Sequence, residues 1–177
     1  MTLGDYFGTP ETVLPQELAY GEWHVADAPL VSHQRVVLKL AMALEEHVSK
    51  RSLGEVFVAP IDVVLDAERA LVVQPDLLFV SRRRAHIVLD RIFGAPDLVV
   101  EVLSPHPRIG KIDQHVRWFA KHGVREIWMY DQSARRMDVL SCEQGHLVSR
   151  REVARFDRIH SAVLPDLDQT LGALIDV

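Results

Sequence analysis

The sequence is poor in cysteine and has no long hydrophobic run. Its single cysteine, Cys142, cannot form a disulfide within the chain, which fits a reducing cytoplasm. The longest apolar runs are only as long as a strand, so no segment is expected to span a bilayer. The opening residues, MTLGDYFGTPE, are polar and acidic and lack the basic and apolar regions of a signal peptide. We therefore expect a cytoplasmic protein with no membrane partner.

Sequence motifs for several common chemistries are also absent. The chain has nine histidines, yet none falls in an HExxH motif or in a His and Cys spacing typical of zinc sites. There is no P-loop, no GxGxxG and no GxSxG. Zinc protease chemistry, phosphoryl transfer from ATP, dinucleotide binding and serine hydrolysis therefore have no support in the sequence.

An excess of positive charge is missing as well. Lys and Arg number 20 against 25 Asp and Glu, which gives a formal net charge of −5. A module that binds nucleic acid mainly through its phosphates is usually basic, so the charge counts against a dedicated DNA-binding module. A nuclease can confine its basic residues to one cleft. The runs Arg82-Arg83-Arg84 and Arg150-Arg151 could serve there, although solvated surface arginines are the commoner explanation of such runs.

Length and periodicity indicate one globular domain over residues 1–177. With 177 residues, 48% of them hydrophobic, and no internal repeat, the chain can build a single core. We expect a lead-in at 1–19, a core at 20–131, and C-terminal strands with a short helix at 132–177. Helices are predicted at 32–50, 112–123 and 171–175, and strands at 20–25, 55–65, 71–80, 97–103, 124–130 and 135–140. This order predicts an α/β fold with a mixed central β-sheet flanked by helices.

Two carboxylates interrupt the apolar strands. Asp76 lies in VVQPDLLFV and Glu101 in LVVEVL. A buried carboxylate is costly without a cation, a hydrogen-bond donor or a proton. If the two strands are neighbours, one Mg²⁺ ion can compensate both. The structural alternative is that Asp76 caps a turn after Pro75 and Glu101 forms an ion pair.

Two further acidic residues lie nearby in the sequence. Asp97 precedes Glu101 by four residues, which in a strand is roughly 13 Å, too far to share a metal ion. It is expected to start the strand after Pro96. Asp62 could approach the site from the preceding strand, but its sequence context gives it weak support.

The segments that carry these carboxylates resemble a known family. The stretches Val73–Asp76, Ala95–Pro105 and Gly123–Trp128, with His33-Gln34 upstream, are similar to the Uma family of restriction endonucleases, within the PD-(D/E)xK nuclease superfamily. The similarity covers residues 20–131. It implies a restriction-endonuclease-like fold and a metal-dependent endonuclease that hydrolyses phosphodiester bonds of nucleic acid, with DNA the expected substrate. It also implies that Asp76 and Glu101 bind Mg²⁺ or Mn²⁺, with the carbonyl of Val102 as an additional ligand.

The sequence departs from the family pattern at the catalytic lysine. In the simplest superfamily motif the lysine lies two residues after the glutamate, where this chain has Leu103. The Uma pattern moves it to the following helix, in the register of His115. Lys111 lies one turn earlier on the same helix face, so we expect it to replace the lysine, unless it is simply solvated at the helix start. His115, with an ordinary pKa near 6.5, is expected to be mostly neutral at pH 7 and to contribute less.

Two alternatives to an active nuclease remain open at this stage. One is a non-catalytic member of the same fold that binds nucleic acid or a protein partner, because the usual lysine position is His115. The other is an unrelated α/β domain with structural carboxylates. A homodimer is expected only by analogy with nucleases that cut both strands. The sequence does not distinguish DNA from RNA, or duplex from single strand.

Overall fold

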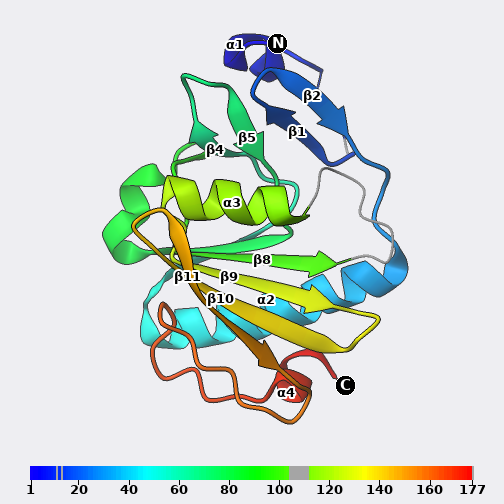
Figure 1. Cartoon of the computed structure of the whole chain (residues 1–177), viewed down its shortest axis with the longest axis vertical. Coiled ribbons are helices and arrows are strands. Elements are labelled where there is room, and N and C mark those ends of the chain that lie inside the picture. The colour runs from blue at the N-terminus through cyan, green and yellow to red at the C-terminus, as the bar shows by residue number, and fades with distance from the viewer. Residues whose placement is uncertain (11, 13, 104–111, 177) are drawn as a thin grey trace.

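The structure is a computed structural model that describes residues 1–10, 12, 14–103 and 112–176. It is built from two β-sheets and the helices packed on them (Figure 1). The elements in chain order are α1 (Leu3–Phe7), β1 (Gln16–Ala19), β2 (Glu22–Val25), α2 (Val31–Arg51), β3 (Gly54–Val58), β4 (Val63–Asp66), β5 (Leu71–Val73), β6 (Leu77–Ser81), the 3₁₀ helix η1 (Arg82–Ile87), β7 (Ile92–Phe93), β8 (Leu98–Leu103), α3 (Ile112–His122), β9 (Glu126–Asp131), β10 (Arg136–Glu143), β11 (His146–Val153) and α4 (Leu171–Ile175).

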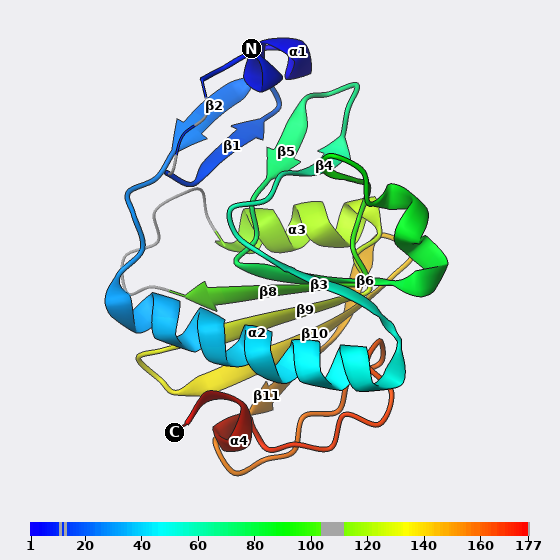
Figure 2. The same cartoon turned by 180° about the vertical axis from the view of Figure 1, so that it is seen from behind.

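The larger sheet forms the centre of the molecule. Among the described residues its strand order is β11-β10-β9-β8-β6-β3, in which β8 and β9 are parallel and the other neighbours are antiparallel. Helix α2 and the C-terminal segment with α4 cover one face, and α3 covers the other (Figures 1 and 2). The predicted mixed α/β architecture with flanking helices is therefore confirmed.

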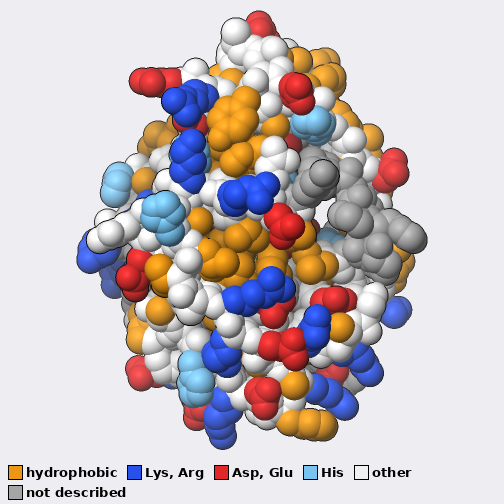
Figure 3. All heavy atoms as spheres, viewed as in Figure 1, with side chains coloured by type: hydrophobic (Ala, Val, Ile, Leu, Met, Phe, Trp, Pro, Cys, Tyr) orange, Lys and Arg blue, Asp and Glu red, His pale blue; other side chains and the backbone are white. Residues whose placement is uncertain are grey.

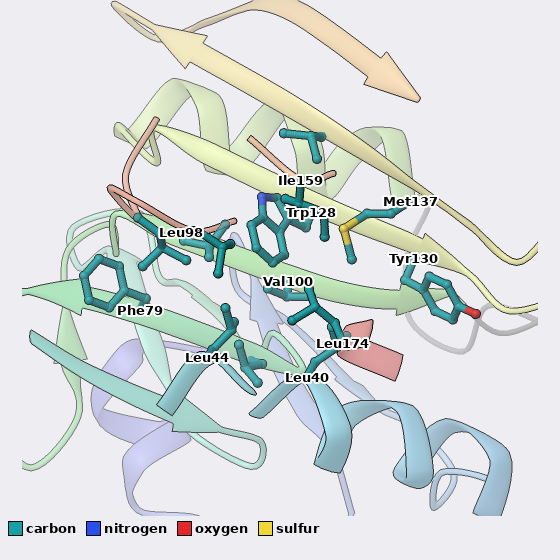
Figure 4. Packing of buried hydrophobic residues seen from close by; sticks show 14 of the residues in the cluster. Leu40, Leu44, Phe79, Leu98, Val100, Trp128, Tyr130, Met137, Ile159 and Leu174 are labelled. Carbon is teal, nitrogen blue, oxygen red and sulfur yellow. The ribbon is translucent and has the colours of Figure 1, made fainter. Parts of the chain in front are cut away.

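Helix α2 forms because its apolar residues recur every three or four positions. Val37, Leu40, Leu44 and Val48 are buried and pack against the central sheet, as the periodicity predicts (Figure 4). Ser32, a residue type that commonly caps helices and that the sequence pattern favours as the N-cap, lies instead at the second position of the helix. The N-cap position is occupied by Leu30, whose side chain makes no capping hydrogen bond.

Strand β9 contributes buried apolar side chains to both faces of the central sheet. Ile127 and Met129 belong to the core on the α3 side, whereas Trp128 is fully buried on the α2 side (Figure 4). The indole N–H of Trp128 donates a 2.7 Å hydrogen bond to Glu126. Trp128 is therefore a core residue.

The two longest predicted strands are each divided between the two sheets. Residues 55–65 form β3 and β4, which are separated by the cis Ala59-Pro60 bond. Residues 71–80 form β5 and β6, with a break at Gln74-Pro75-Asp76. Proline has no N–H to donate to a strand ladder, so each proline marks the point where the chain leaves one sheet and enters the other. The turn predicted at 66–69 is confirmed, because β4 and β5 pair antiparallel.

The smaller sheet contains a strand that the sequence did not indicate. Its order is β2-β1-β5-β4-β7 among the described residues, so the predicted lead-in contributes β1, which pairs with both β2 and β5. The edge strand predicted at 20–25 is β2, although Tyr20 and Gly21 form the preceding turn, with φ of 54° and 91°. A separate small core lies under this region. Its buried members are Tyr6, Leu18, Val64, Ala70 and Val72.

The C-terminal region agrees with the prediction in part. The strand predicted at 135–140 is β10, and the predicted short helix is α4. Strand β11 was missed because most of its side chains are exposed and its sequence, HLVSRREV, lacks a buried alternation. None of the helices in the described residues is long and apolar enough to cross a membrane.

Candidate active site

Asp76 and Glu101 lie side by side at one end of the central sheet. Asp76 immediately precedes β6, and Glu101 lies within β8, the neighbouring antiparallel strand. The register pairs Leu77 with Val100, so one step further places Asp76 opposite Glu101. Val100 and Val102 pack on the α2 side of the sheet, and alternation along the strand therefore turns Glu101 toward α3.

The carboxylate of Asp76 is fixed from two directions. The backbone N–H of Val102 donates to Oδ2 at 2.7 Å, and Nε2 of His33 on α2 lies 3.1 Å from the same oxygen. An ionised carboxylate can only accept, so Nε2 must carry the proton. Among the described residues no donor reaches Oδ1. These bonds come from distant elements, so Asp76 does not act as a local turn cap.

The imidazole of His115 lies between two carboxylates. Its Nδ1 is 3.9 Å from Oε1 of Glu101, and its Nε2 is 3.2 Å from Oε2 of Glu17 on β1. The angles at Nε2 fall short of those of a hydrogen bond, so the contact with Glu17 is an ion pair. Trp118 stacks on the ring, with 5.3 Å between centroids. His115 is buried by these neighbours.

The two carboxylates decide the charge of this histidine. Burial lowers the pKa of His115, but Glu101 and Glu17 outweigh it and raise the pKa to about 10. His115 is therefore expected to be protonated at pH 7 and not mostly neutral, because it lies between Glu101 and Glu17, and only the first of these was predicted at the site. Burial also raises the pKa of Glu101, to about 7, with His115 opposing and Asp76 adding to the rise.

Glu17 and His33 are the site residues that sequence reasoning missed. Glu17 is only 3% exposed, and its Oε1 accepts from the N–H of Gln74 at 3.3 Å. Nothing in the local sequence of β1 distinguishes this glutamate from one on the surface. His33 was noted only as part of a family pattern, and its contact with Asp76 spans 43 residues of sequence. Neither contact could be inferred from local spacing.

Helix α3 carries His115, another predicted site residue. His115, Trp118, Phe119 and Ala120 are its buried residues, whereas the apolar stripe expected from the sequence also included Ile112 and Val116, which are only partly buried. His115 on this helix lies near Glu101. Lys111, the predicted replacement for the lysine, lies outside the described residues.

Asp97 and Asp62 form hydrogen bonds and ion pairs with residues away from Asp76 and Glu101. Asp97 lies just before β8, is buried, accepts from the N–H of Ser81 at 2.8 Å and faces Arg125 at 3.6 Å. This agrees with the expectation that it starts the strand. The carboxylate of Asp62 is held by the side chains of Tyr6, Gln74 and Arg91. Neither residue lines the cavity beside Asp76.

The two arginine runs do not reach the site. Arg82–Arg84 belong to η1, which follows the far end of β6, roughly 20 Å along the strand from Asp76. Arg150 and Arg151 lie on β11, at the opposite edge of the sheet. Arg150 pairs with Asp138 at 2.6 Å. The explanation as surface arginines is therefore the correct one for both runs.

A cavity of about 490 Å³ opens beside these groups. Its walls combine the site residues with apolar side chains from α2 and from the end of β3. The described lining residues are Pro15, Glu17, Ala26, Pro29, His33, Gln34, Val37, Leu38, Ala41, Val58, Ala59, Pro60, Gln74, Asp76, Glu101, Val102, Leu103, Ile112 and His115. This set contains three carboxylates and two histidines but no lysine or arginine.

The carboxylate oxygens of Asp76 and Glu101 fit a divalent cation such as Mg²⁺. No group of three or more His, Cys, Asp or Glu side chains suited to a metal occurs among the described residues. Mg²⁺, however, is usually held by only one or two carboxylates. The carbonyl of Val102 points toward the same neighbouring strand as its N–H, which reaches Asp76. The register ends at the pair Leu77 with Val100, and Pro75, two residues before Leu77, has no N–H with which to occupy that carbonyl.

A solved structure and a family model are similar to this chain. A crystal structure described as that of "a putative nuclease belonging to DUF820", from Anabaena variabilis ATCC 29413, superposes with a TM-score of 0.82 at 16% sequence identity. The alignment covers 99% of this chain and 97% of that one, so the two share a fold. No curated protein matches. The model of the family Uma2, described as "Putative restriction endonuclease", matches residues 6–172, and the chain therefore belongs to that family.

Proposed function

We propose that this protein is a metal-dependent endonuclease that hydrolyses phosphodiester bonds of nucleic acid, with DNA as its substrate. The observation that supports it best is the pairing of Asp76 and Glu101 on neighbouring strands of a nuclease-like fold, at the wall of a cavity. Asp76 and Glu101 are the proposed ligands of Mg²⁺ or Mn²⁺, with the carbonyl of Val102 as a third. Its proposed location is the cytoplasm, which suits a chain with one cysteine.

Each residue has a separate role in this proposal. A divalent cation, when bound, acidifies water and offsets the charge that develops on phosphate. His33 and the N–H of Val102 hold Oδ2 of Asp76, which leaves Oδ1 to face a ligand. His115 supplies a fixed positive charge beside Glu101 and thereby limits the repulsion between the carboxylates. Lys111 is proposed to add a second positive charge, and a homodimer is proposed by analogy with nucleases that pair two active sites.

The direct test is cleavage by the purified protein. We expect labelled DNA to be cut with Mg²⁺ or Mn²⁺, and cutting to stop when EDTA removes the metal, because the carboxylates alone would repel phosphate. Single-stranded and duplex DNA and RNA are assayed side by side, with product lengths read on denaturing gels. Equal cutting with and without EDTA would contradict metal dependence.

The second candidate is a non-catalytic protein of the same fold. It is favoured by one specific feature, the presence of His115 at the position where the family pattern expects lysine. Binding of nucleic acid without cleavage under any of the metals above would support it.

His33 is expected to matter for metal affinity and not for folding. Its ring orients Asp76, and partners of metal ligands commonly affect affinity by 10- to 100-fold. We expect His33→Ala to weaken Mn²⁺ binding by about tenfold in calorimetric titrations, whereas His33→Gln, which keeps a donor, should restore part of it. Ser32→Ala, at the preceding position of the helix and outside the described cavity lining, is the control. Unchanged Mn²⁺ affinity in His33→Ala would show that Asp76 is not oriented by this contact.

A further inference from the structure

We propose that the cavity beside Asp76 and Glu101 receives an unpaired nucleotide, with its base against the apolar wall. The preferred substrate is then a single strand, an end or a gap, and not continuous duplex. This inference rests on the proposed nuclease function and adds the class of substrate. Two features support it: the apolar residues of the cavity wall and the positions of the basic residues.

The apolar wall begins directly at the candidate metal ligand. The N–H of Ala59 donates to the backbone oxygen of Asp76 at 3.0 Å, which brings Val58, Ala59 and Pro60 beside it. On the other side, His33 contacts Asp76 at 3.1 Å, and Val37 lies one helical turn further along α2. A ligand whose phosphate is held at Asp76 would therefore have an apolar surface as its next neighbour.

Helix α2 extends this surface away from the carboxylates. His33, Val37 and Ala41 follow one another at intervals of four residues, and the three positions span about 12 Å of helix. Leu38 lies on the same wall and is 58% exposed, so it presents its side chain to whatever enters. The apolar faces of a base fit such a wall, and sequence-tolerant binding of single strands commonly depends on contacts with base faces. The amide of Gln34 at the wall can meet the polar edge of a base.

The charge distribution disfavours a duplex as the ligand. Continuous duplex presents phosphates along its length and is held by rows of Lys and Arg. The described lining of the cavity contains no lysine or arginine, and both arginine runs lie elsewhere. On the coloured part of the face that carries α3, basic and acidic side chains are interspersed and form no continuous basic band (Figure 3). Bases of an intact duplex are stacked inside it and would have to be extruded to enter the cavity.

The test compares two variants on one face of α2. Leu38 lines the cavity, whereas Met42, one turn later and 60% exposed, does not. Binding of a short fluorescein-labelled DNA strand, the same strand annealed to its complement, and the matching RNA strand is measured by anisotropy with Ca²⁺. We expect the wild-type protein to bind a single strand more tightly than duplex. Leu38→Ala should weaken single-strand binding by about tenfold, from the loss of apolar contact, and Met42→Ala should not.

The outcomes separate this inference from the proposed function. Equal affinity for duplex and single strand, or equal effects of Leu38→Ala and Met42→Ala, would overturn the inference, even if the protein cuts DNA. Single-strand binding that depends on Leu38, without cleavage under Mg²⁺ or Mn²⁺, would support the inference and overturn the nuclease proposal. Absence of binding and of cleavage would overturn both. Tighter binding of the RNA strand would keep the inference and change the substrate to RNA.

Discussion

Glu101→Gln is expected to reduce metal-dependent cleavage by about a thousandfold or more, because a charged ligand of the proposed cation is lost. The amide keeps the size of the side chain but not its charge, so the cavity should keep its shape. Asp76→Asn should have an effect of the same order. The measurement is the initial cleavage rate at saturating Mn²⁺, together with Mn²⁺ affinity from calorimetry.

The fold should survive these two substitutions. Burial raises the pKa of Glu101, and in Glu101→Gln the buried His115 keeps its contact with Glu17 at 3.2 Å. We therefore expect a smaller loss of stability than in His115→Ala, which removes the positive charge from both carboxylates. Asp97→Ala, at the other end of the same strand, is the contrast. It leaves the N–H of Ser81 without its acceptor and should lower stability by about 1–3 kcal/mol without changing Mn²⁺ affinity. Full cleavage by Glu101→Gln would remove Glu101 from the site.

His115→Ala is expected to show the second largest effect. The substitution would leave Glu17 and Glu101 facing each other across a buried space without a positive charge. Removing one partner of a buried ionic group commonly costs about 3–5 kcal/mol, and we expect a loss of this order in urea unfolding. Cleavage should fall by about a hundredfold, since the charge beside the phosphate is lost. His115→Lys, which keeps a cation, should retain cleavage and most of the stability.

Lys111→Ala tests which residue, Lys111 or His115, supplies more of the positive charge that assists cleavage. The sequence pattern predicts that Lys111 carries the catalytic charge and that His115 contributes modestly. The contact of His115 with Glu101 reverses that order, so we now expect Lys111→Ala to reduce cleavage less than His115→Ala does. A larger loss in Lys111→Ala, at unchanged stability, would restore the original ranking.

The central sheet could be predicted from the sequence because its strands are short apolar runs bounded by turn residues. The carboxylates Asp76 and Glu101 were identifiable for the same reason, since a charge is conspicuous within an apolar strand. Glu17 was not identifiable, because its burial depends on β1 pairing with β5, more than 50 residues away. The charge of His115 depends on Glu17 as well as on Glu101, and the strand that carries Glu17 was not predicted. The single-domain assignment stays a prediction.

The pairing of β1 with β5 determines how easily the hairpin of β1 and β2 opens locally. In the part of the chain that the structure describes, the ladder between β1 and β5 has two residue pairs, Leu18 with Val72 and Ala19 with Leu71, and hydrogen bonds of Gln74 with Gln16 and Glu17 add to it. Below it lies a core of few buried side chains. Such a unit can open at a free energy well below that of global unfolding. Any opening of this hairpin would separate Glu17 from His115, so the charge balance of the site depends on how firmly β1 stays paired.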